Sequence, residues 1–367
     1  MKVARKLGAI LLTALTLGGA GAAARAEVAP GAYQALNVAV VEDYVLPRYA
    51  AFAEASAALE TSLNRACTDG RAEAAESAQA YHAAMDAWMA VQHLRFGPSE
   101  LFLRYDRIEF WPDPRGVVRR HLAQLLSDRD PAALQPEAFA NGSVAVQGFP
   151  ALERLLFDSD DKDWATPFTC DLVRAIGGNL RAIAEGLYDD WRGGEIHFAQ
   201  VLTGAGQGGN ARYFDAKEAS LDLAKSLRAA LLLVQDYKLG RPLGKSQDAA
   251  LATRAESHRS ARSLRNVALN LKAAQALYEG TDTSFSSLAR VQPKGADLDD
   301  AIRGAFARLV AAAAAQPDSL IAALEAPDGW QQLDAIRVEA RQLLELLGGP
   351  LSTVLDLPMG FNSFDGD

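Results

Sequence analysis

A carboxylate in an unusual setting gives the first candidate for chemistry, in the segment Gly148-Phe-Pro-Ala-Leu-Glu153. Pro150 lacks a backbone N–H and clashes with the preceding helical turn, so a helix must either start or kink there. The surrounding residues are apolar enough to be buried, where a carboxylate needs a partner. Glu153 is therefore a candidate ligand-binding residue and a candidate metal ligand. Gln147, directly before the segment, joins it as a ligand-binding candidate.

A second group of candidates lies in residues 96–116, which contain three prolines and five aromatic residues among charged side chains. No single helical or strand period fits the stretch. Long loops of this kind are more often functional or tightly packed than mobile. Its centre supplies Arg107, Glu109 and Trp111 as candidate ligand contacts.

A third group lies in residues 254–266, where four arginines stand among Ser, Glu and Asn at the start of a predicted helix. Such residues bind an anion or a carboxylate in a polar crevice. The alternative is a solvated helix start whose serines cap the backbone. The candidates are Glu256, Ser257, Arg262 and Asn266.

Other familiar catalytic patterns receive little support. His82 and Asp86 are one helical turn apart and could share a cation, although exposed polar residues on an amphipathic helix would show the same spacing. The sequence has no His-Glu-x-x-His or His-x-x-Glu pattern and no Gly-x-Ser-x-Gly elbow. A zinc protease of familiar type and a serine hydrolase are therefore not indicated.

Helices must position all of these groups, because apolar residues recur every three or four positions along most of the chain. We expect an all-α fold of two antiparallel helical bundles, with a long irregular aromatic and charged loop at 95–116. The glycine-rich segment 204–210 is predicted to be a linker. It would separate an N-terminal bundle over 27–203 from a C-terminal bundle over 211–367.

The start of the chain predicts export. Residues 1–26 combine a basic start, the short apolar run 7–17 and small residues at a cleavage site after Ala26, which are features of a secretory signal peptide. Removing its four basic residues changes the formal charge from -9 to -13. This acidity argues against nucleic acid as a partner. No apolar run is long enough for a transmembrane segment.

Cys67 and Cys170 are the only cysteines. They lie far apart and lack the Cys-x-x-Cys spacing of redox pairs. In an oxidising compartment, the simplest prediction is one structural disulfide.

The sequence also resembles the imelysin-like family, which includes insulin-cleaving metalloproteases and iron-regulated proteins. The matching segments follow the family order over essentially the whole predicted mature chain: 88–98, 108–113, 147–157, 256–257, 263–266, 270–271, 277–280 and 360–367. The resemblance implies two helical bundles, a periplasmic or cell-envelope location, a site between the bundles and a link with iron uptake. It also implies a metallopeptidase activity claimed for founding members, which rests on a Gly-x-His-x-x-Glu motif.

This sequence departs from that motif where a metal would bind. Gly148 and Glu153 are present, but Pro150 stands in place of the histidine and has no lone pair for a metal. Peptidase activity is therefore the less favoured expectation.

We expect a periplasmic binding or accessory protein for a small molecule or a metal-bearing ligand, with iron or another divalent metal as the implied cofactor. One alternative is a metallopeptidase that takes a histidine from elsewhere. The other is a structural protein of the cell envelope that contacts partner proteins. Whether Glu153 faces the crevice or caps backbone groups at the interruption distinguishes ligand binding from a structural role.

Overall fold

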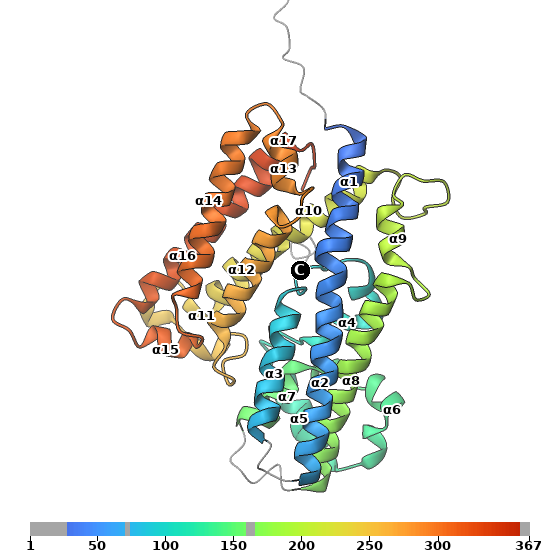
Figure 1. The fold of residues 1–367 in the computed structure, drawn as a ribbon. Coiled ribbons are helices and arrows are strands. Elements are labelled where there is room, and N and C mark those ends of the chain that lie inside the picture. Colours follow the sequence, from blue (N-terminus) through green and yellow to red (C-terminus); the bar gives the residue numbers. More distant parts are fainter. Residues whose placement is uncertain (1–27, 70–73, 159–165, 360–367) are drawn as a thin grey trace, which may run out of the picture.

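The computed structural model describes residues 28–69, 74–158 and 166–359, and every regular element in these ranges is a helix (Figure 1). The predicted all-α fold is confirmed. The predicted signal peptide and the family-like segment 360–367 lie outside the described residues. None of the described helices has the length and apolar character that crossing a membrane requires.

The first half is built around α2, which packs against α3 and α8. The apolar positions of α8 recur every three or four residues and are buried, at Leu172, Ile176, Leu180, Ile183 and Leu187. The longer elements are α1 (Pro30–Val40), the π-helical turn η1 (Val41–Val45), α2 (Leu46–Asp69), α3 (Ala74–Met89), α5 (Val117–Asp128) and α8 (Pro167–Arg192). The shorter helices are α4 (Arg104–Ile108), α6 (Pro136–Ala140), α7 (Phe149–Glu153), the π-helical η7 (Arg154–Asp158) and α9 (Phe198–Thr203).

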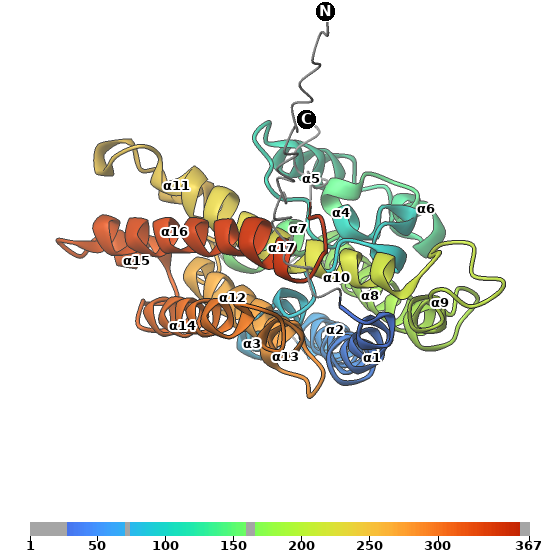
Figure 2. The same ribbon diagram turned by 90° about the horizontal axis from the view of Figure 1, so that it is seen from above.

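The second half packs α12 against α14 and α14 against α16. Its longer elements are α10 (Ala216–Leu232), the π-helical η9 (Leu233–Gly240), α12 (Ser263–Glu279), α14 (Gly295–Ala314) and α16 (Gly329–Leu346). Its shorter helices are α11 (Arg241–Leu243), α13 (Phe285–Arg290), α15 (Leu320–Leu324), the π-helical η12 (Leu347–Leu351) and α17 (Ser352–Val354). Figure 2 shows α14 and α16 on one side of the molecule and α1, α2 and α8 on the other.

The two halves share a buried interface. Helix α1 packs against α10, and α3 packs against α12. Buried side chains join the halves: the Tyr44 hydroxyl donates to the carbonyl of Ala273 at 2.9 Å, and Asn270 Nδ2 donates to the carbonyl of Met89 at 2.8 Å. One cluster of buried apolar residues includes members of both halves. The segment 204–210 forms turns between α9 and α10, and its role as a boundary between folding units stays a prediction.

Helical backbone runs without a break from Pro30 to Asp69, since η1 joins α1 to α2 with right-handed helical dihedral angles on both sides. Pro47 follows this π-helical turn, and a proline that cannot donate to the preceding turn favours such a wider turn. In Figure 1 this long helix passes beside α10 at one end and alongside α3 and α8 at the other.

The 95–116 stretch is more ordered locally than a single irregular loop. It contains two 3₁₀ turns, η3 (Gly97–Ser99) and η4 (Leu101–Leu103), and then α4. Phe102 and Leu103 have φ values of 56° and 55°, which interrupt the right-handed helical backbone within η4 and directly before α4. Each helical segment is thus too short to produce a recognisable helical period of apolar residues in the sequence. Residues 109–116 are irregular.

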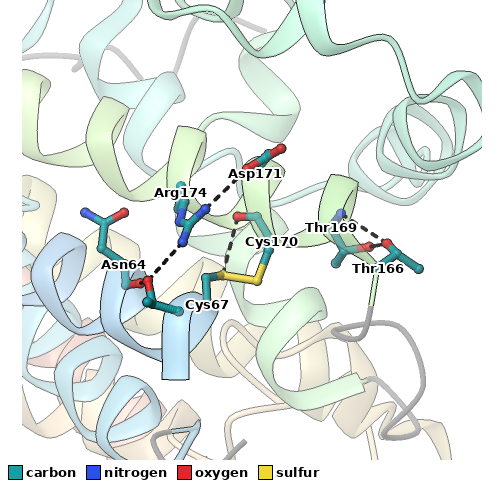
Figure 3. Close-up of a disulfide and its surroundings, with 8 residues drawn as sticks. Asn64, Cys67, Thr166, Thr169, Cys170, Asp171 and Arg174 are labelled. Carbon is teal, nitrogen blue, oxygen red and sulfur yellow. Dashed lines mark hydrogen bonds and ion pairs between the residues drawn. A yellow bond between two sulfur atoms is a disulfide. The ribbon is translucent and has the colours of Figure 1, made fainter. Parts of the chain in front are cut away.

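The predicted disulfide is present between Cys67, near the end of α2, and Cys170, in the first turn of α8 (Figure 3). The two Cα atoms are 5.6 Å apart. Arg174 of α8 donates to the hydroxyl of Thr68 at 3.3 Å beside it. The bond therefore fastens the far end of the long helix to α8.

Candidate ligand-binding site between the two halves

Glu153 joins the two halves. Helix α7 starts at Phe149 with Pro150 in its first turn, where the missing N–H costs nothing. Glu153 is the last residue of α7 and is 4% exposed. Its Oε1 accepts hydrogen bonds from Ser260 N at 2.9 Å and Ser260 Oγ at 2.7 Å. Burial raises the pKa of Glu153, and the bonds from Ser260 oppose that rise. The carboxylate thus binds the second half, and these bonds do not cap its own helix.

Gly148 allows α7 to sit directly on the preceding backbone. A Cβ at this position would lie 2.1 Å from the carbonyl oxygen of Ile108 and 2.3 Å from that of Arg107. The adjacent Gln147 is fully buried, and its Oε1 accepts from Arg107 Nε at 2.6 Å. Arg107 also donates to Asn179 Oδ1 at 2.7 Å. Glycine is thus needed for close approach, and α7 is held against α4 by a polar network.

We expect Gly148→Ala to lower the free energy of unfolding by about 3 kcal/mol, the upper end of the usual cost of overpacking. The reason is that the clash is with two backbone oxygens, which cannot rotate away as a side chain would. Urea denaturation followed by circular dichroism measures the change. Gly31→Ala is the matched control, because nothing lies within 4 Å of its added Cβ in α1. Equal stability of the two variants would contradict the prediction.

A cavity of about 550 Å³ lies beside Glu153. Its walls come from the irregular residues 109–116, Val118 of α5, helix α7 with the first residue of η7, and the segment 253–259 of the second half, together with Tyr81 and Arg241. Four of the residues predicted from the sequence line it: Glu109, Trp111, Glu153 and Ser257. The volume is in the range of cavities that hold small organic ligands, roughly 300–1,000 Å³.

Glu109 is the most unusual group on the cavity wall. It is 3% exposed, and its Oε2 has no hydrogen-bond partner in the described part of the chain. Burial, followed by the nearby charge of Glu256, raises the pKa of Glu109 well above its usual range, although Lys238 opposes the rise. The neutral acid is therefore favoured, and it offers an O–H donor.

Behind the cavity, Lys238 and Glu256 form a buried ion pair. Lys238 Nζ lies 2.5 Å from Glu256 Oε2, and both side chains are 1% exposed. Glu256 also accepts from Gln92 Nε2 at 3.1 Å and from Asn266 Nδ2 at 2.6 Å. Burial lowers the pKa of Lys238, and Glu256 opposes that change. Bonds from several directions satisfy the carboxylate, as a buried ion pair requires.

Arg262 is buried and bridges α12 and α3. It donates to Asn266 Oδ1 at 2.8 Å, to the carbonyl of His82 at 2.8 Å and to Asp86 Oδ1 at 2.5 Å. Arg265 also binds the Asp86 carboxylate, with Nε at 2.9 Å. The pair His82 and Asp86, which could have shared a cation, thus holds a guanidinium from the second half.

The predicted site residues therefore separate into two groups. Four line the cavity, and the other five lie in the supporting hydrogen-bond networks: Arg107, Gln147, Glu256, Arg262 and Asn266. Lys238 was not among the predicted residues. The sequence signal at this position is a single lysine in the mostly apolar segment 231–239. Such a lysine more commonly extends its charged end to solvent.

The surroundings of Glu153 do not fit a resident metal ion. Ser260 occupies its Oε1 with two hydrogen bonds, and Pro150 has no electron pair to offer. Across the residues that the structure describes, no three His, Cys, Asp or Glu side chains are grouped so that they could hold a metal. That Glu153 is a metal ligand stays a prediction.

Fold and site together define an all-helical protein of two packed halves with a polar cavity between them. Residues 45–347 match the family model described as Imelysin, and the chain belongs to the imelysin family. The resemblance seen in the sequence is confirmed. No curated protein gives a significant match.

Two solved structures share the fold. An imelysin-like protein from Psychrobacter arcticum 273-4 has a TM-score of 0.75 at 20% identity, over 91% of this chain and 99% of that one. A protein described as a putative iron-regulated protein A precursor, from Parabacteroides distasonis ATCC 8503, has a TM-score of 0.70 at 15% identity, over 90% and 96%.

Proposed function

We propose that the protein is an exported, periplasmic binding protein that holds a small molecule or a metal-bearing ligand in the cavity between its halves. It would act as an accessory protein in the uptake of iron or another divalent metal. The observation that carries this proposal is the position of Glu153 on the cavity wall, held from across the interface by Ser260. Glu109 and Trp111 supply further polar and aromatic surface in the same cavity.

Separate observations support the periplasmic location and the connection with metal uptake. The signal-peptide features of residues 1–26 support export to the periplasm. The fold shared with the Parabacteroides protein, which is described as iron-regulated, supports a role in iron metabolism. A receptor or transporter of the cell envelope is the kind of partner that such a role would involve.

A metallopeptidase is the less favoured alternative, because Pro150 replaces the motif histidine and the described residues provide no grouped metal ligands. A purely structural envelope protein is disfavoured by the cavity itself. A structural role would need neither a cavity of this volume nor a buried Glu109 whose Oε2 has no hydrogen-bond partner among the described residues.

Native mass spectrometry and elemental analysis of protein taken from the periplasm test the proposal. We expect a small molecule bound in a one-to-one ratio. Trp111→Ala and Glu153→Gln should weaken its binding at least about tenfold. The first change removes aromatic contact, and the second weakens the charge-assisted hydrogen bonds from Ser260 that hold the two walls of the cavity together.

Glu137→Gln is the matched control for the loss of a carboxylate, because Glu137 is exposed on α6, away from the cavity lining. Circular dichroism would verify that each variant is folded. Wild-type protein that carries no ligand and binds none, or cavity variants that bind like the control, would refute the proposal.

A further inference from the structure

The charges on the cavity wall differ in sign from the protein as a whole. The formal net charge of the chain is -9, yet four arginines line the cavity: Arg154, Arg241, Arg254 and Arg259. Three acidic residues also line it: Glu109, Asp113 and Glu153. The number of charges left for a ligand depends on which of these groups already have partners.

The acidic groups are largely engaged. Asp113 accepts from the backbone N–H groups of Val117 and Val118, both at 2.8 Å, at the start of α5. Glu153 accepts from Ser260, and Glu109 favours its neutral form. These carboxyl groups therefore oppose a bound anion less than three free carboxylates would.

Two of the arginines form ion pairs, and the other two form none with the described residues. Arg154 and Arg259 both pair with Asp158. Arg241 lies over the ring of Tyr237, 4.5 Å from its centroid, and the Arg254 side chain is exposed. Within the described residues, neither Arg241 nor Arg254 has an ion pair or a side-chain hydrogen bond to another side chain. Two guanidinium groups at one cavity are thus available to bind oxyanions.

We infer that the cavity binds a small organic oxyanion, with its carboxylate or phosphate groups at Arg241 and Arg254 and an acceptor oxygen at the buried carboxyl of Glu109. The inference rests on the proposed function and specifies its ligand class. The cavity volume of about 550 Å³ has room for an organic molecule with several such groups. An oxyanion of this kind can also chelate a metal, so it could bring iron to a cavity whose own side chains do not hold it.

Isothermal titration with citrate and with pyrophosphate tests the ligand class and distinguishes carboxylate from phosphate. Spermidine and glucose serve as cationic and neutral probes. We expect at least one oxyanion to bind, and the double change Arg241→Met, Arg254→Met to weaken it roughly tenfold to hundredfold.

Arg192→Met is the matched control, since Arg192 is an exposed arginine at the end of α8, outside the cavity lining. Glu109→Gln keeps a hydrogen-bond donor and should retain most of the binding, whereas Glu109→Ala should weaken it. This contrast separates a donor role from a purely electrostatic one.

The outcomes separate the two claims. Arginine-dependent oxyanion binding supports the inference. Binding of a neutral or cationic ligand alone, or oxyanion binding that is unchanged in the double variant, overturns the inference but leaves the proposed function standing. Protein that carries no ligand and binds none of the probes overturns both.

Discussion

Lys238→Met should lower the free energy of unfolding by about 3–5 kcal/mol, the usual cost of leaving one member of a buried ion pair without its partner. Glu256 would keep a buried carboxylate beside Glu109, with only the amides of Gln92 and Asn266 to stabilise it. Urea denaturation monitored by circular dichroism gives the value. We expect a larger effect here than at any exposed ion pair.

A double-mutant cycle identifies the cause. Lys238→Met combined with Glu256→Gln removes both charges and should recover a large part of the lost stability, because no unpaired charge remains. Arg308→Ala is the control, since Arg308 forms an exposed pair with Glu339 that should contribute less than about 1 kcal/mol. If Lys238→Met were no more harmful than Arg308→Ala, the ion pair would not stabilise the folded protein.

Loss of the disulfide should have an effect of similar size. Cys67 and Cys170 are 103 residues apart in sequence, and closing a loop of this length contributes about 4–5 kcal/mol in the chain-entropy model. We expect the double change Cys67→Ser, Cys170→Ser to lower the free energy of unfolding by nearly this amount.

Chemical denaturation with and without a reducing agent measures the effect of the disulfide. The reductant should shift the midpoint of the wild-type protein to that of the double variant and leave the double variant unchanged. A wild-type midpoint that is insensitive to complete reduction would contradict the prediction.

The buried faces of the helices could be predicted because they depend on the spacing of apolar residues along one segment. The disulfide could be predicted because two cysteines allow only one pairing. The buried face of α8 follows directly from the recurrence of Leu172, Ile176 and Leu180. That a helix starts or kinks at Pro150 likewise follows from one missing N–H, and the structure has a start, at Phe149. Such signals require no knowledge of the distant parts of the chain.

The division between cavity wall and supporting network could not be predicted in the same way. Arg107 and Glu109 are neighbours in a stretch without a period, yet one bonds Gln147 and the other lines the cavity. The contact between Arg262 and Asp86 joins residues 176 positions apart. Lys238 lies in a π-helical segment, whose altered register turns side chains away from the directions that an α-helical period predicts.

The unbroken helix from Pro30 to Asp69 has a consequence for how a partner could recognise the loaded protein. Because this helix packs on both halves, and Arg262 also fastens them together, the halves cannot hinge apart without disrupting buried contacts. Ligand binding should therefore leave the radius of gyration in solution nearly unchanged. Under the proposed function, an envelope receptor would then have to sense occupancy by touching the ligand or the exposed cavity residue Arg254, rather than by responding to a change in molecular shape.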